Sequence, residues 1–179
     1  IGASLETGAL LWSRPFITGA TTTSQTPILY NDTVIQNGRG NGVTAFRVTE
    51  GAAGWTTEDV WHTDEVSLHM ANPVVNDGVL FGLSHLNSGQ YFALDLDTGE
   101  VLWTSAPRQA DHASIQRAGS TIFSLEDDAE LLVLEHSRTE FNPLRRYDVA
   151  DSETWTQPTL AGDRLYIKDV STLALWRID

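Results

Sequence analysis

A chain of 179 residues can bury a hydrophobic core as one domain, and 41% hydrophobic residues with a mean hydropathy of −0.19 is ordinary for a globular protein. The formal net charge of −13 is spread along the chain and disfavours nucleic acid as a partner, and no apolar run approaches the roughly 18 residues of a membrane span. The absence of cysteine excludes disulfides, thiolate metal sites and a cysteine nucleophile.

The first element in the chain belongs to a repeated phrase. Residues 1–16 contain LETGALLW and none of the features of a secretory leader. A longer relative, ALDLDTGEVLW, occupies residues 93–103. Four positions therefore recur after 91 residues, namely Thr7, Gly8, Leu11 and Trp12 as Thr98, Gly99, Leu102 and Trp103. A recurring phrase of this kind indicates a repeat architecture.

A second phrase supplies the intermediate repeats: two apolar residues, a turn pair and a further apolar run. Its copies are TPILYNDTVIQ, NPVVNDGVLFG, ASIQRAGSTIFS and QPTLAGDRLYI, and their turn residues Asn31, Asn76, Ala118 and Ala161 are spaced by 45, 42 and 43 residues. The turn pairs are residue types that tolerate positive φ: Asn31-Asp32, Asp77-Gly78, Gly119-Ser120 and Gly162-Asp163. Each copy predicts a hairpin between the first two strands of a sheet.

Two more apolar runs complete each repeat. The third strands are VTAFRV, QYFALDL, ELLVLEH and TLALWRI, and the fourth strands end at Trp12, Trp61, Trp103 and Tyr147. Helical periodicity is missing throughout. We therefore predict an all-β fold, a β-propeller of about four blades with four antiparallel strands each. The blades are expected at 17–65, 66–110, 111–151 and, incomplete, 152–179, after the closing strands of a preceding blade at 1–16; residues 49–59 are expected to be an irregular loop.

The segment from Ala93 to Trp103 resembles the signature of the pyrroloquinoline-quinone repeat, the blade of quinoprotein dehydrogenases and of BamB-like proteins of outer-membrane assembly. The resemblance implies that the tryptophan docks on a glycine peptide of a neighbouring blade, with the alanine beneath it. The expected clamp residues are Gly8, Trp12, Trp61, Ala93, Gly99 and Trp103. Trp55, Trp155 and Trp176 fall outside this slot.

Two arrangements of the ring are open. Residues 3–14 could close the blade at 152–179 and give a four-bladed ring, or the chain could be the C-terminal half of a propeller with about eight blades, which we favour. An isolated half would expose a sheet edge. Its expected partners are then the remaining blades of a parent propeller or a second copy of the chain.

The search for catalytic and ligand-binding motifs gives little. Neither HExxH nor a close His-x-His pair is present, and the Glu, Asn and Asp set that binds calcium in quinoproteins is not clustered, so no catalytic residue, cofactor or metal is expected. Asp111, His112 and Ser114 cannot form a relay, because adjacent residues of a strand point to opposite faces. GRGNG at 38–42 is expected to be a strand-to-strand turn, and the acidic run 126–128 a solvated turn.

His69 and His85 are the candidate binding residues. They flank the best-formed hairpin, and strand ends on one rim of a blade could bring them together. With no catalytic set, the sequence predicts a non-enzymatic scaffold that binds an unidentified protein partner. The alternative is a fragment of a quinoprotein dehydrogenase or carbohydrate-active propeller with its catalytic site elsewhere. The resemblance implies a periplasmic, envelope or secreted location.

Overall fold

The structure is a computed structural model that describes residues 1–18 and 24–178, and it consists of strands in five antiparallel sheets. Three sheets have four strands, one has three and one has two. We call the larger sheets blades 1 to 4 in chain order. Blade 1 contains β3 (Ile28–Tyr30), β4 (Thr33–Asn37), β5 (Val43–Gly51) and β6 (Gly54–Thr63). Blade 2 contains β7 (Val74–Asn76), β8 (Val79–Ser84), β9 (Gln90–Asp95) and β10 (Val101–Thr104), and blade 3 contains β11 (Ala113–Ala118), β12 (Thr121–Glu126), β13 (Glu130–Glu135) and β14 (Pro143–Asp148). Blade 4 contains β15 (Thr159–Ala161), β16 (Arg164–Lys168) and β17 (Leu173–Arg177).

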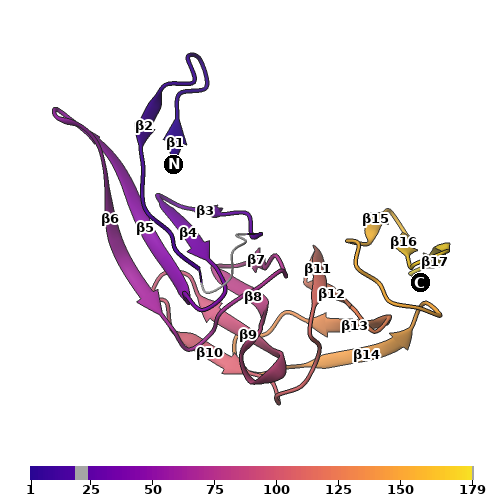
Figure 1. The fold of residues 1–179 in the computed structure, drawn as a ribbon. Helices are drawn as coiled ribbons and strands as arrows, with labels where there is room; N and C mark the ends of the chain where they lie inside the picture. Colours follow the sequence, from indigo (N-terminus) through magenta and orange to yellow (C-terminus); the bar gives the residue numbers. More distant parts are fainter. Residues whose placement is uncertain (19–23, 179) are drawn as a thin grey trace.

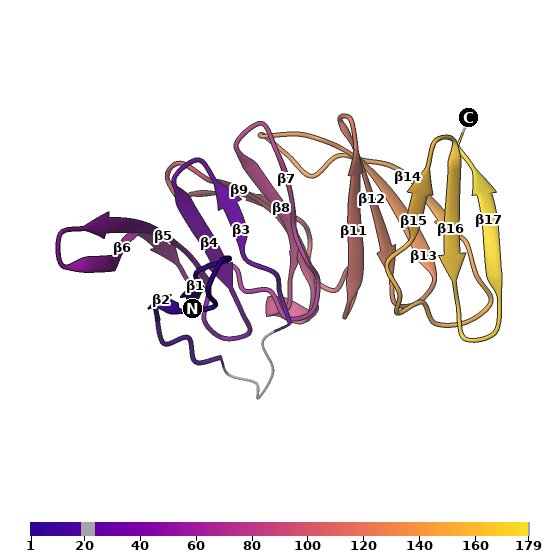
Figure 2. The same cartoon turned by 90° about the horizontal axis from the view of Figure 1, so that it is seen from above.

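The blades follow one another along an open arc, and each is a simple up-and-down sheet (Figure 1). Figure 2 shows the same succession from above, from β6 at one end to β17 at the other. The helical content of the described residues is one short 3-10 turn, η1 (Leu86–Ser88). The expectation of an all-β fold built from four-stranded antiparallel sheets is confirmed.

The four predicted hairpins are present with two-residue turns. The closing pairs are Tyr30–Thr33, Asn76–Val79, Ala118–Thr121 and Ala161–Arg164. Asn31 and Asp77 adopt positive φ at 51° and 46°, as their short polar side chains allow. The register of each blade is thereby set by its turn and by its apolar pattern.

The hydrophobic core consists of three clusters, one at each contact between neighbouring blades. The middle strands contribute most, and all six residues of β8 are buried. Phe81, Tyr91 and Ala93 of blade 2 pack with Ile122 and Leu132 of blade 3. Blades 2 and 3 thus each bury one face against the blade before and the other against the blade after.

The loop expected at residues 49–59 is instead the end of a long hairpin. β5 and β6 pair as far as Gly51–Gly54, with Thr49 opposite Thr56 and Glu50 opposite Trp55. Pairing of β-branched and aromatic residues across the strands stabilises the extended backbone. The glycines that suggested an irregular segment lie at the hairpin tip, where Gly54 has a φ of 107°.

Residues at the N-terminus form a separate two-stranded sheet, β1 (Gly2–Ala3) with β2 (Leu10–Trp12). Among the described residues this sheet does not pair with blade 4, so closure into a four-bladed ring is not the arrangement in this structure. The indigo N-terminal strands and the yellow strand β17 lie at opposite ends of the arc (Figure 1). The favoured alternative, half of a larger propeller, stays a prediction.

The best-formed clamp joins blades 1 and 2 through Trp61 and Gly99. The indole N–H of Trp61 donates to the carbonyl oxygen of Leu96 at 3.0 Å. A Cβ placed on Gly99 would lie 2.6 Å from two carbons of the Trp61 ring, so the indole lies directly on this glycine. The hairpin turn is held in place by Asp95, whose carboxylate accepts the backbone N–H groups of Asp97 and Thr98.

The remaining clamp residues differ from one another. Trp103 donates its indole N–H to the carbonyl oxygen of Ser137 in blade 3 at 2.9 Å, and Ala93 is fully buried beside it. Trp12 packs edge-on against Phe46 of blade 1, with ring centroids 5.8 Å apart. Gly8 has no described atom within 4 Å of a Cβ placed on it, so its role as a docking surface stays a prediction.

Blades 3 and 4 are joined by a tryptophan from outside the predicted slot. Tyr147, expected in the aromatic slot of β14, is 47% exposed. Trp176 of β17 instead donates its indole N–H to the carbonyl oxygen of Val149 at 3.2 Å. At this contact the aromatic group comes from the following blade.

Replacing Trp103 with phenylalanine is expected to lower the free energy of unfolding by about 1–2 kcal/mol, because the partly buried carbonyl of Ser137 loses its donor and the ring shrinks. Urea denaturation measures this difference. The control is Trp155→Phe, since the Trp155 residue is 54% exposed and its indole N–H donates to the exposed Glu153 carboxylate, and a cost below about 0.5 kcal/mol is expected. Equal costs would contradict the clamp.

Candidate binding site on one rim

Loops from every blade gather at one edge of the molecule. Because the strands alternate in direction, the loops between the second and third strands lie at the same end as the segments that join blades. We call this edge the loop rim. It consists of residues 38–42, 85–89, 127–129 and 169–172 between strands, and 64–73, 105–112 and 149–158 between blades. The two-residue hairpin turns lie at the opposite rim.

Hydrogen bonds fasten the loop rim of blades 1 and 2. The hydroxyl of Ser67 donates to the carbonyl oxygen of Gly38 at 3.0 Å and accepts the N–H of Gly40 at 2.9 Å. The N–H of His85 donates to the carbonyl oxygen of Ser67 at 2.8 Å. The GRGNG segment is thus a strand-to-strand turn, as predicted, and it is held by the segment that leads to blade 2.

The loop rim of blade 3 is organised by Asp127. Its carboxylate accepts the backbone N–H of His112 at 3.0 Å, its N–H donates to the carbonyl oxygen of His112, and its own carbonyl accepts the N–H of Thr154. The segments before and after blade 3 are therefore tied to one loop. The side chains of His112 and Trp155 project from a rigid backbone.

Glu126 corrects the expectation of a solvated acidic turn, because it is only 1% exposed. The hydroxyl of Tyr91 donates to its Oε1 at 2.6 Å, and Nη1 of Arg146 lies 3.7 Å from its Oε2. Burial raises the pKa of Glu126 to about 7, against the lowering effects of the Tyr91 hydrogen bond and of Arg146. This carboxyl group lies between blades 2 and 3 and is part of the fold.

The two candidate histidines do come together on the loop rim. The ring centroids of His69 and His85 are 6.2 Å apart. His112, which sequence reasoning considered only as part of a relay, lies 5.7 Å from His69, and its other side meets Trp155 at 4.9 Å. His69, His112 and Trp155 thus form a continuous row of rings across three blades, which we call the aromatic row.

A signal for the aromatic row was present in the sequence. Positions 69, 112 and 155 are separated by 43 residues each time, which is the repeat period. All three residues lie in successive segments between blades. An aromatic ring conserved in position from repeat to repeat predicts stacking between neighbours, and a comparison of equivalent positions would have added His112 and Trp155 to the site.

Arg39 completes the histidine group. A hollow of about 250 Å³ is lined by Arg39, His69, His85, Ser88, Gly89, Asp111 and His112. Burial lowers the pKa of His69 and of His85, and the nearby positive charge of Arg39 lowers both further. At neutral pH these rings are therefore uncharged, and each offers one N–H donor and one acceptor nitrogen.

The hollow has unused hydrogen-bonding capacity. Arg39 is exposed, and its guanidinium makes no hydrogen bond or ion pair with any residue in the described part of the chain. Nε2 of His85, another residue that lines the hollow, is buried without a described partner. Buried polar atoms in native proteins nearly always find a partner, which can be water or a ligand. The hollow is therefore suited to a polar or anionic group.

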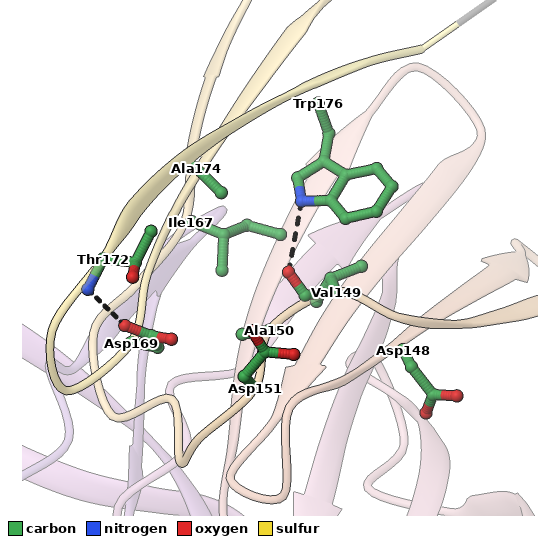
Figure 3. A pocket seen from close by; sticks show the side chains of 9 residues that line it. All are labelled: Asp148, Val149, Ala150, Asp151, Ile167, Asp169, Thr172, Ala174 and Trp176. Atoms are coloured by element: carbon green, nitrogen blue, oxygen red, sulfur yellow. Dashed lines mark hydrogen bonds between the residues drawn. The ribbon is translucent and has the colours of Figure 1, made fainter.

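A second hollow, of about 320 Å³, lies between blades 3 and 4 (Figure 3). Trp176 and Ile167 line it together with three carboxylates, those of Asp148, Asp151 and Asp169. The backbone N–H of Thr172 bonds the Asp169 carboxylate and holds its pKa below the ordinary value. The Asp169 carboxylate bonds within its own turn, and the Trp176 indole bonds to Val149. We therefore interpret this hollow as part of the structural contact between blades 3 and 4.

Other classes of site have no counterpart in residues 1–18 and 24–178. No three histidine, aspartate or glutamate side chains there are grouped to hold a metal ion. No helix in these ranges has the length and apolar character needed to cross a membrane. The expectations that the protein has no catalytic residues, cofactor or metal remain predictions.

Comparison with protein families gives a match over the whole chain. The family model described as outer membrane protein assembly factor BamB matches residues 1–179, the whole chain. A search of curated proteins finds no match.

Several solved structures share the fold. BamB from Moraxella catarrhalis matches with a TM-score of 0.67 and 17% identity over 87% of this chain and 46% of its own. The computationally designed Ika4 protein matches with a TM-score of 0.62 and 15% identity over 90% of this chain and 94% of its own. The chain thus spans about half the length of the BamB structure. The predicted propeller architecture is confirmed by these likenesses, which at this identity concern the fold alone.

Proposed function

Since the chain belongs to the family of the outer membrane protein assembly factor BamB, we propose that it is a non-catalytic scaffold that binds a protein partner in the cell envelope, with the loop rim as its contact surface. The family match over the whole chain carries this proposal. The named role of the family is assembly, which requires contacts between proteins and needs no reaction centre.

The exposure of apolar side chains supports the choice of the loop rim. Met70, Trp155 and Val170 are large apolar residues on this rim, and 43%, 54% and 73% of their surfaces are exposed. Aromatic residues and methionine are enriched at the centres of protein interfaces. The backbone beneath them is fixed by the hydrogen bonds of Ser67 and Asp127, so the surface is preorganised for binding.

Site-specific photo-crosslinking tests the proposal. A photoreactive phenylalanine analogue placed at position 155 of the full-length protein, in cells that make it, is expected to give an adduct with a protein of outer-membrane assembly. The control position is Asp163, in the hairpin turn of blade 4 on the opposite rim. Equal adducts from both positions, or no adduct from either, would contradict binding through the loop rim.

A further inference from the structure

The guanidinium of Arg39 has no hydrogen bond or ion pair with residues 1–18 and 24–178, in a chain where acidic residues outnumber basic ones by 24 to 11. Most other arginines here make hydrogen bonds or ion pairs within the protein, such as the ion pairs Arg14–Asp59, Arg47–Asp32 and Arg138–Asp95. Arg39 instead lines the same hollow as the three imidazole rings of His69, His85 and His112. A free guanidinium with nearby N–H donors is the arrangement that recognises a carboxylate.

A long acidic segment does not suit this site. The net charge of −13 repels a partner that carries many negative charges. Asp111 also lines the hollow, and its negative charge disfavours a ligand that brings more than one negative group. The chemistry therefore selects one carboxylate within an otherwise neutral segment.

The aromatic row adds a second recognition element. It leads from His69 beside the hollow through His112 to Trp155, whose ring is 54% exposed and ends the row. An exposed tryptophan fixed by a neighbouring ring offers an apolar surface on which an aromatic side chain can stack. A segment that lies along the row can place its carboxylate at Arg39 and an aromatic ring at Trp155.

From these features we infer that the hollow between Arg39, His69 and His112 binds a single carboxylate of an extended partner segment, whose neighbouring aromatic side chain stacks on Trp155. This inference rests on the protein-binding function proposed above and names the chemistry of the partner. His85 also lines the hollow, with its ring centroid 6.2 Å from that of His69, and Ser88 adds a hydroxyl to the lining.

The test uses the peptide acetyl-Phe-Gly-Asp-Gly-Phe-amide and its counterpart with Asn in place of Asp. Titration followed by NMR of the imidazole signals is expected to show saturable shifts of His69 and His112 with the Asp peptide. The Asn peptide is expected to bind about tenfold more weakly, because it lacks the charge that pairs with Arg39. Equal binding of the two peptides would overturn the inference.

Matched variants locate the site. Arg39→Gln is expected to weaken binding of the Asp peptide about tenfold and to leave the weak binding of the Asn peptide unchanged. Arg177→Gln is the control, since Arg177 is an exposed arginine on β17 in blade 4, away from the hollow. Trp155→Ala is expected to weaken both peptides alike. If Arg177→Gln had the same effect as Arg39→Gln, general charge attraction would explain the binding and the site would be wrong.

Two further titrations separate other ligands. Inorganic phosphate is expected to compete only weakly, and stronger binding of phosphate than of the Asp peptide would overturn the assignment to a carboxylate. Zinc ions are expected not to shift the histidine signals at equimolar concentration. A stoichiometric zinc complex would overturn the inference and indicate that the histidines form a metal site. If crosslinking at position 155 succeeds while the Asp peptide does not bind, the scaffold function stands and this inference fails.

Discussion

Replacing Gly99 with alanine is expected to lower the free energy of unfolding by about 2–4 kcal/mol. The backbone at Gly99 has a φ of 78°, a left-handed conformation that costs an alanine about 1 kcal/mol. The added methyl group would also lie 2.6 Å from the Trp61 ring, so the indole must move away from the glycine and lose its bond to Leu96. Denaturation in urea, followed by circular dichroism, measures the loss.

Gly119 is a matched control for this substitution. Its φ of 61° is also left-handed, but nothing in the described residues lies within 4 Å of a Cβ placed there. Gly119→Ala is expected to cost about 1 kcal/mol, the backbone part alone. If the two variants were equally destabilised, contact with Trp61 would not be the reason for glycine at position 99, and the clamp would be unsupported.

The hairpins and the repeat of the blades could be predicted from the sequence, because each depends on residues within a short segment. Turn pairs such as Asp77-Gly78 mark hairpins by themselves, and the repeat period sets the number of blades. The extension of β5 and β6 was missed since Gly51 and Gly54 are turn residues in most contexts. Only the pairing of their neighbours shows that these glycines lie at a hairpin tip.

Contacts between blades were harder to predict, since they depend on side chains from different repeats. Trp61 and Gly99 were found through a motif, whereas the use of Trp176 at the last contact follows no motif. Glu126 resembled a surface residue because its neighbours in sequence are acidic, yet its environment is set by Tyr91, 35 residues earlier in the chain. Whether a charged residue is buried depends on the residues that contact it in the fold, and its neighbours in the sequence do not show which residues these are.

Glu126→Gln is expected to remove a loss in the free energy of unfolding, of up to about 3 kcal/mol, that the parent protein shows as the pH rises. Burial raises the pKa of Glu126 from 4.5 to about 7, so the folded protein holds this proton more tightly than the unfolded chain. Below pH 4.5 the carboxyl is neutral in both states and carries no penalty. As the pH rises to 7 and above, the unfolded chain ionises freely while the folded protein must ionise a buried group, which lowers stability by roughly 1.4 kcal/mol for each unit of difference.

The glutamine variant removes this ionisation and keeps an oxygen that accepts from Tyr91. It should therefore unfold like the parent protein at pH 4.5 and be more stable at pH 8, as measured by urea denaturation across this range. Glu140→Gln, an exposed change on the same blade, controls for the loss of one negative charge and should shift stability by less than about 0.5 kcal/mol at either pH.

Tyr91→Phe distinguishes the hydrogen bond from burial as the influence on Glu126. The Tyr91 hydroxyl stabilises the ionised carboxylate and so lowers the pKa of Glu126, while burial acts in the other direction and is the larger effect. Without the hydroxyl, the loss of stability should still begin near pH 4.5, where the unfolded chain ionises, but it should continue to higher pH and become deeper, because the pKa of Glu126 in the folded protein rises further. A profile that does not change in Tyr91→Phe would mean that Arg146 alone supports the charged form, and the contact between blades 2 and 3 would then depend on the ion pair instead of the tyrosine.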